Sequence, residues 1–278
     1  MDISEKNLEE TIEQALLATV PQVELNPARR ELGQPSPLYG AMTANLATGD
    51  VVPGGYHKRK SEDYDKAHCL LPGDVLDFIY ATQPKEWEKF KKQHEADAKM
   101  RFFQRLSGEI RASGTLDVLR KGIKANGCKF QLAYFRPASG LNYGHLKLYA
   151  GNIFSEVRQL HYSERNNNSL DLVLFLNGLP IFTAELKNPF TGQNVQDAIQ
   201  QYRFDRDPHE ALFAFGRCLA HFAVDPDLVY MTSHLEGPAT RFLPFNQGRN
   251  GGAGNPAFVE GICNGISLGA YLGAGQRA

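Results

Sequence analysis

The segment SLDLVLFLNGLPIFTAELKN, residues 169 to 188, constrains the fold more than any other part of the chain. Two apolar runs flank Asn177-Gly178, a dipeptide typical of tight hairpin turns. The segment therefore predicts a β-hairpin of two apolar strands. Its open end carries Asp171, Glu185 and Lys187, and a hairpin that only fills a core has no use for three charges there.

The length of the turn decides whether these charges can meet. Side chains alternate along a strand, so Glu185 and Lys187 share one face. A simple two-residue loop would pair Asp171 with Ala184 and leave Glu185 on the opposite face. A three-residue loop, or a one-residue bulge near Asn177 to Pro180, would bring Asp171 and Glu185 to the same face. Because proline cannot donate to the ladder, we expect an irregular start to the second strand.

Two carboxylates and a lysine that converge at a hairpin end suit metal-assisted hydrolysis. Mg²⁺ binds one or two carboxylates together with waters and substrate phosphate, and the ion activates water and neutralises phosphate charge. An ammonium group beside it can stabilise the transition state. From the spacing alone, a solvated strand edge with no chemical role remains the alternative.

The rest of the chain predicts an α/β domain with a mixed β-sheet flanked by helices, because helical and strand-like patterns alternate after an initial helical part. Residues 21 to 52 are rich in proline, glycine and small polar residues, which favours an inserted loop. The expected helices cover residues 4–17, 83–106, 113–124, 194–208 and 210–224, and the expected strands outside the hairpin cover 129–135, 152–163, 228–233 and 240–245.

Composition narrows the class of protein. With 30 basic and 31 acidic residues the net charge is −1, which argues against a tail-driven polyanion binder but leaves room for a local basic cleft. No apolar run approaches the roughly 18 residues of a membrane span, and the acidic start does not resemble a secretory signal. The four cysteines form no C-x-x-C pair, so we expect reduced thiols and a cytoplasmic protein.

The hairpin end also resembles a known motif. Asp171 followed by Glu185-Leu186-Lys187 is similar to the PD-(D/E)xK nuclease motif. Together with DAIQQYRFDRDP, AFGRCLAHFAVDPDLVYMTS and FLPFNQG, the hairpin resembles the N-terminal nuclease domain of the R subunit of type I restriction–modification enzymes. The likeness covers roughly residues 4 to 20 and 53 to 256, and it implies a restriction-endonuclease-like core.

The resemblance implies a role for particular residues. Asp171 and Glu185 would hold Mg²⁺, and Lys187 would act on the attacking water. Glu9, on the first helix, would complete the metal site, with a solvent-facing glutamate as the alternative. The family's Gln-x-x-x-Tyr helix is only partly matched, because Phe204 stands four residues after Gln200; Gln200 is still carried over as a catalytic residue.

Basic residues are candidates for DNA contact. Arg203, on the helical flank beyond the hairpin, is placed to meet phosphate. Lys58, Arg59 and Lys60 interleave with aromatic residues, a combination typical of nucleic-acid binding. A solvated charged face is the alternative for this basic run.

The resemblance also implies partners and limits. It predicts a Mg²⁺-dependent endonuclease that acts on double-stranded DNA beside methyltransferase and specificity subunits, with no membrane. The alternative is a catalytically silent domain that docks DNA or those subunits. No G-x-x-x-x-G-K-[ST] motif is present, so ATP would enter only through a motor domain that this chain lacks. We expect residues 1 to 245 to form the nuclease domain and residues 246 to 278 to be a glycine-rich linker and an atypical tail.

Overall fold

A computed structural model describes residues 5–17, 43–45, 50–52, 55–138, 142–188 and 192–246. The contacts between residues divide the chain into two compact units. Unit 1 contains residues 1–16, 157–174 and 180–278, and unit 2 contains residues 17–156 and 175–179.

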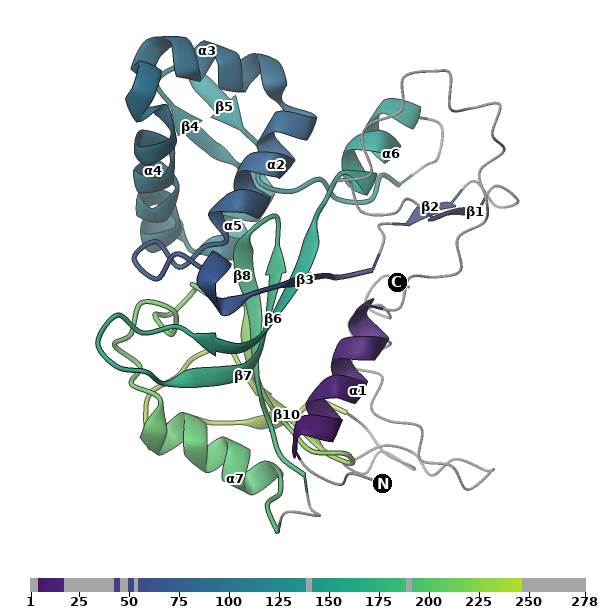
Figure 1. Cartoon of the computed structure of the whole chain (residues 1–278), viewed down its shortest axis with the longest axis vertical. Helices are drawn as coiled ribbons and strands as arrows, with labels where there is room; N and C mark the ends of the chain where they lie inside the picture. The colour runs from purple at the N-terminus through teal and green to yellow at the C-terminus, as the bar shows by residue number, and fades with distance from the viewer. Residues whose placement is uncertain are drawn as a thin grey trace. The chain divides into compact units, whose positions relative to one another are not determined.

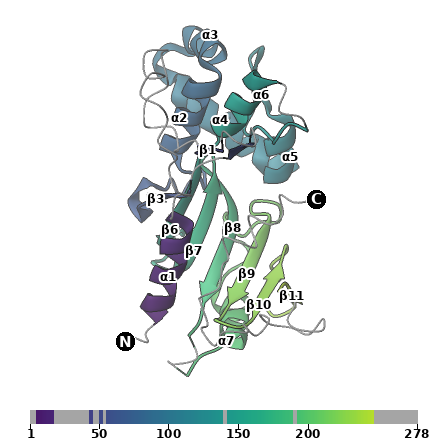
Figure 2. The same cartoon turned by 90° about the vertical axis from the view of Figure 1, so that its right-hand side faces the viewer.

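A seven-stranded sheet has the order β11-β10-β9-β8-β7-β6-β3 (Figure 2). Strands β8 and β9 are parallel, whereas β9 with β10 and β10 with β11 are antiparallel. The sheet is therefore mixed and has flanking helices, and the predicted α/β class is confirmed. The strands are β3 His57–Arg59, β6 Phe154–His161, β7 Ser169–Leu176, β8 Leu179–Leu186, β9 Ala220–Val224, β10 Val229–Thr232 and β11 Leu243–Pro244.

Unit 1 packs helix α7, Val195–Gln200, against the sheet. Asn194 and Asp197 form a capping box at the start of this helix, which satisfies backbone donors that would otherwise lack partners. Ala198 and Ile199 lie in a buried cluster with Ala223 of β9. The helix continues as a π-helix, Gln201–Asp205. Helix α1, Glu5–Leu17, lies beside β6 and β7 (Figures 1 and 2).

Unit 2 is mainly helical, with an aromatic core. Trp87, Phe90, Phe102 and Phe130 are buried and meet largely edge to face, a favourable arrangement for aromatic rings. Its elements are α2 Pro72–Thr82, α3 Pro84–His94, α4 Ala98–Ser113, α5 Thr115–Lys121, α6 Tyr143–Ala150 and the hairpin β4 Ile123–Ala125 with β5 Cys128–Phe130.

The tip of the β7–β8 hairpin belongs to unit 2 and is buried there. The side chain of Asn177 is fully buried. Its Oδ1 accepts a hydrogen bond from the Ile153 backbone N at 2.7 Å, and its Nδ2 donates to Leu132 O at 2.8 Å and to Asn152 Oδ1 at 2.9 Å. The turn is thus an anchored interior feature, although most hairpin turns lie at the surface.

Two predicted helices differ from the structure. The segment 210–224 is not a helix, because turns lead into strand β9 at Ala220. The predicted helix 83–106 is two helices, α3 and α4, joined by the short 3₁₀ segment Glu95–Asp97. Glu95 has a φ of 48°, a left-handed backbone that an α-helix cannot continue through.

Two predicted segments, the insertion and the C-terminal tail, lie mostly outside the described residues. Within the expected insertion 21–52, only strands β1, Thr43–Asn45, and β2, Asp50–Val52, are described, and they pair antiparallel. Of the expected tail, only residue 246 is described. Over the described parts of the chain, no helix is long and apolar enough to cross a membrane.

Candidate active site

The hairpin turn has two residues, so of the two expected alternatives, an odd-length loop or a bulge, the odd-length loop does not occur. Strand β7 ends at Leu176 and β8 begins at Leu179. Asn177 and Gly178 both have positive φ, at 51° and 78°, as the tightest hairpin turns require.

Backbone hydrogen bonds nevertheless indicate an offset of one residue after the turn. Backbone groups of alternate strand residues point to opposite neighbours. In a two-residue turn, the backbone N–H and C=O of Leu179, the first residue of β8, point toward β7. If the alternation were unbroken, the backbone groups of Ile181 and Lys187 would point toward β7 as well. Instead, Ile181 O accepts from Leu219 N, immediately before β9, and Lys187 N donates to Val224 O of β9, both at 2.8 Å. One extra residue at Pro180 accounts for this, so the hydrogen bonds support the predicted bulge.

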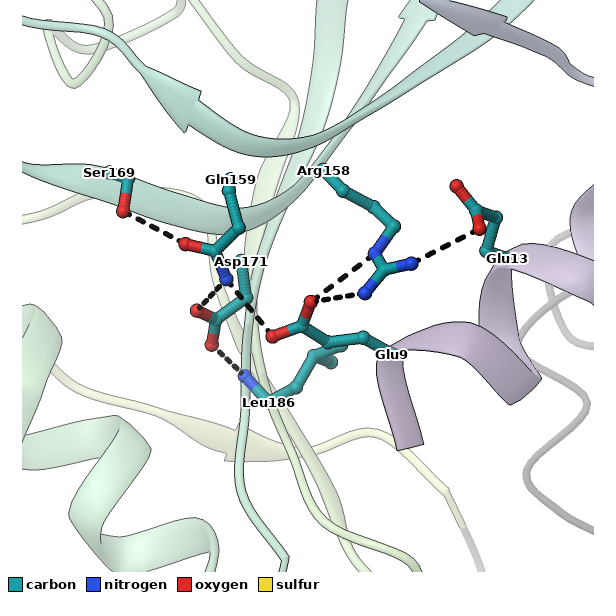
Figure 3. A network of polar contacts seen from close by, with 7 residues as sticks. All are labelled: Glu9, Glu13, Arg158, Gln159, Ser169, Asp171 and Leu186. Atoms are coloured by element: carbon teal, nitrogen blue, oxygen red, sulfur yellow. Dashed lines mark hydrogen bonds and ion pairs between the residues drawn. The ribbon is translucent and has the colours of Figure 1, made fainter. Parts of the chain in front are cut away.

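The offset places Asp171 opposite Glu185, and their carboxylates interact. Asp171 lies on β7, and its Oδ2 accepts a hydrogen bond from the backbone N of Leu186 at 2.8 Å (Figure 3). The Asp171 charge also raises the pKa of Glu185. The two carboxylates expected at the hairpin end are therefore brought together.

Glu185 is completely buried. Its Oε1 accepts a hydrogen bond from Arg206 Nε at 2.7 Å, within a buried ion pair. Its Oε2 has no hydrogen-bond partner. Burial first, and the Asp171 charge second, raise the pKa of Glu185 to about 8, although Arg206 acts in the opposite direction. A buried carboxylate with one oxygen unpartnered is unusual in a folded protein. The close approach of Asp171 also raises the pKa of Glu185, and either a proton shared by the two carboxylates or a bound cation would satisfy that oxygen.

Glu9 of α1 joins the same site and does not face solvent. Arg158 of β6 donates to Glu9 Oε2 from Nε at 3.2 Å and from Nη2 at 2.8 Å, and from Nη1 to Glu13 at 3.1 Å. Gln159 Nε2 donates to Glu9 Oε1 at 3.0 Å and to Asp171 Oδ1 at 3.2 Å. Burial raises the pKa of Glu9, while its hydrogen bond from Arg158 opposes the shift.

Lys187 follows the last residue of β8 and is largely buried, with 9% of its surface exposed. Its backbone N bonds to β9, so the alternation of β8 continues to this residue. Lys187 therefore extends from the same face as Glu185, two residues away.

The remaining predicted residues lie elsewhere. Gln200 is exposed at the end of α7, and Arg203 donates from Nε and Nη2 to the Thr240 backbone oxygen at 3.0 and 2.8 Å. Lys58 and Lys60 are exposed on unit 2. Arg59 is ion-paired with the buried Asp74 at 2.9 Å, so its charge has a structural partner.

Three features of the site had no role in the sequence prediction. Arg206 pairs with Glu185 and donates to Ser169 O at 2.8 Å. Gln159 bridges two carboxylates. Behind the site, Thr183 Oγ1 lies 2.8 Å from Tyr202 OH and 2.8 Å from His221 Nδ1. Of these residues, only Arg206 could have been noticed in the sequence. It lies in RFDRDP, within a segment that was part of the family resemblance.

The described residues contain no group of three or more His, Cys, Asp or Glu side chains arranged to hold a metal ion. The three-carboxylate set of Glu9, Asp171 and Glu185 is thus not assembled as such, and Glu9 is committed to Arg158 and Gln159. Asp171 and Glu185 fit an ion better, because Glu185 Oε2 is unpartnered and a Mg²⁺ site needs only one or two carboxylates.

The family model of the type I restriction enzyme R protein N terminus matches residues 80–240, more than half of the chain. The chain belongs to this family. The match to the type I restriction enzyme R protein N terminus includes Arg158, Gln159, Asp171, Glu185, Lys187 and Arg206, but Glu9 lies outside it. No curated protein and no solved structure matches the chain.

Proposed function

We propose that this chain is a Mg²⁺-dependent endonuclease domain that hydrolyses phosphodiester bonds of double-stranded DNA. The observation that carries the proposal is the pair of carboxylates at the hairpin end. Asp171 and Glu185 interact there, Glu185 is buried, and one of its oxygens has no hydrogen-bond partner. Membership in the restriction-enzyme family supports the reaction class.

Each residue of the site would have a distinct role in this reaction. Asp171 and Glu185 would hold the ion, and Arg206 fixes Glu185 through its Oε1, which leaves Oε2 for coordination. A bound Mg²⁺ would acidify a water and neutralise charge on phosphate oxygens. Lys187, on the Glu185 face, would orient the attacking water and stabilise charge on the phosphate. Methyltransferase and specificity subunits, and a motor that uses ATP, complete the proposed assembly.

Plasmid nicking in Mg²⁺ tests the proposal with variants that preserve side-chain shape. Asp171→Asn and Lys187→Met should each reduce nicking at least about a hundredfold, the scale seen when a transition-state contact is removed. Glu164→Gln changes an exposed carboxylate of the same unit and should nick like the parent. EDTA should abolish all nicking. If the fragment alone is silent, the same comparison is made in complex with its partner subunits.

A second candidate is a catalytically silent domain that docks DNA or partner subunits. The ion pair between Arg206 and Glu185 favours it, since Arg206 gives Glu185 a counter-charge without any metal. This candidate predicts DNA or subunit binding that EDTA and Asp171→Asn leave unchanged, with no nicking in the assembled complex. Nicking that disappears with Asp171→Asn would exclude it.

A further inference from the structure

Arg158 and Gln159 are consecutive residues of β6, yet both side chains bind Glu9. Consecutive side chains of a regular strand point to opposite faces, so one of the two must depart from strand geometry. Gln159 does so: its φ is 48°, the left-handed region that non-glycine residues rarely adopt. Such backbone persists at functional sites where the surroundings hold it in place. This backbone turn is what aims the Gln159 amide at the carboxylates.

The hydrogen bonds of Glu9 and Asp171 leave one oxygen of each carboxylate for Gln159 (Figure 3). Glu9 Oε2 is taken by Arg158, and Asp171 Oδ2 by the backbone N of Leu186. The two remaining oxygens, Glu9 Oε1 and Asp171 Oδ1, both accept from the same nitrogen, Gln159 Nε2, at 3.0 and 3.2 Å. A single neutral donor thus lies between two acids that come from different elements.

We propose that Gln159 is a positioning residue that holds the Glu9 and Asp171 carboxylates together in the metal-free protein and is displaced from Asp171 Oδ1 when a divalent ion binds at Asp171 and Glu185. The inference rests on the proposed function, in which Asp171 and Glu185 would hold the ion. Two features suit the role. An amide N–H₂ offers two donors and no charge, so it relieves the repulsion of the acids without the strength of a cation. Gln159 is also exposed, so its side chain can leave without disturbing the core.

Gln159→Met tests the displacement, because methionine is similar in length and has no N–H donor. An ion entering the variant no longer has to break the amide hydrogen bond to Asp171. Because hydrogen bonds from a neutral donor make modest net contributions, the variant of the full chain should bind Mn²⁺ roughly tenfold more tightly. In EDTA the same variant should melt at a lower temperature, because the carboxylates then repel each other. A purely structural residue would lower the melting temperature without tightening Mn²⁺ binding.

Two further variants sharpen the measurement. Ser169 Oγ donates to Gln159 Oε1 at 3.0 Å, so Ser169→Ala should loosen the amide and tighten Mn²⁺ binding by a smaller factor. Gln104→Met changes an exposed glutamine of unit 2 and should bind Mn²⁺ like the parent. Free Mn²⁺ is counted by electron paramagnetic resonance during the titration.

The outcomes separate this inference from the nuclease proposal. Equal or weaker Mn²⁺ binding by Gln159→Met, with normal binding by the parent, overturns the inference alone. A parent that binds no Mn²⁺ overturns both. Tighter binding together with a lower melting temperature in EDTA supports the displacement.

Discussion

At the residue scale, the electrostatics of the candidate site centre on whether Glu185 is ionised. Burial and the nearby Asp171 charge disfavour its ionised form, and Arg206 offsets only part of this cost. The pKa of Glu185 is thereby raised to about 8, so its ionised form is less favourable in the folded protein than in water. A cation at Oε2 would favour the ionised form, so under the proposed function metal binding should become tighter as the pH rises.

The charge state gives a pH dependence of stability. The pKa of Glu185 is raised from 4.5 to about 8 on folding, so its favourable contribution is complete below pH 4.5 and is lost as the pH rises to 8. Glu185→Gln never ionises and should melt increasingly above the parent from pH 5 to pH 8 in EDTA. One pKa unit corresponds to about 1.4 kcal/mol, and 1 kcal/mol to about 2–4 °C, so the gap should reach about ten degrees by pH 8. Parallel melting curves for the two proteins would contradict this.

Gly178 gives a second prediction at this scale. A Cβ there would lie 2.5 Å from Leu71 O and 2.5 Å from Val75 Cγ2, and its φ is 78°. Gly178→Ala should therefore lower the free energy of unfolding by about 3 kcal/mol or more, since strain and a clash add. Gly127 has a similar φ of 75° but open space around it, so Gly127→Ala should cost only about 1 kcal/mol. Urea unfolding of both variants separates the clash from the strain.

At the scale of elements, strand β8 carries both Glu185 of the candidate site and part of a buried polar network. Thr183 precedes Glu185 by two residues and shares its face. Its hydroxyl lies between Tyr202 of the π-helix and His221 of β9. Burial lowers the pKa of His221 to about 3, with a smaller contribution from His234, so the imidazole is neutral and the network carries no charge of its own. The network fixes the part of β8 that presents Glu185.

Thr183→Val tests this network because valine keeps the shape of threonine. The change leaves Tyr202 OH and His221 Nδ1 without the buried hydroxyl that joins them, and such groups cost about 1–3 kcal/mol each when unsatisfied. The variant should therefore unfold with a free energy lower by about 2–4 kcal/mol. Tyr202→Phe removes one of the same hydrogen bonds, so the double variant should lose less than the sum of the single variants. Strict additivity would show that the two groups are not coupled.

Sequence patterns predict elements better than they predict the contacts between them. The apolar runs around Asn177-Gly178 were sufficient to predict the β7–β8 hairpin. The segment 210–224 was misassigned because a short apolar run does not distinguish a helix from a strand buried on both faces, and all five residues of β9 are buried. Asp171, Glu185 and Lys187 could be proposed from the sequence because they form a local motif. Arg206 and Gln159 escaped notice because their partners are set by tertiary structure and by one left-handed residue.

At the scale of the whole molecule, the two units do not follow the order of the chain. Unit 1 takes three separate segments, and unit 2 takes residues 175–179 from within the hairpin of unit 1. The proposed metal site lies entirely in unit 1, since residues 9, 171, 185 and 187 all belong to it. Its assembly therefore depends on segments far apart in sequence.

Binding of a divalent ion should stabilise the whole chain by mass action. At a concentration one hundred times its Kd, Mn²⁺ should add about 2.7 kcal/mol to the free energy of unfolding, or several degrees in melting temperature. Asp171→Asn should lose most of this increase. ATP in place of the metal should leave the melting temperature unchanged, because the chain lacks a P-loop motif. An ATP-dependent shift would contradict the assignment of ATP to another domain.

The buried turn should also slow deamidation of Asn177. In a flexible chain, an Asn-Gly step loses its side-chain amide readily, because the glycine nitrogen attacks the asparagine carbonyl and closes a succinimide ring. Here both ends of the Asn177 amide are held by hydrogen bonds inside unit 2, so ring closure requires the turn to open. Aspartate and isoaspartate at position 177 therefore accumulate only during such openings. The rate at which these two products appear would therefore report how often the hairpin tip unfolds locally.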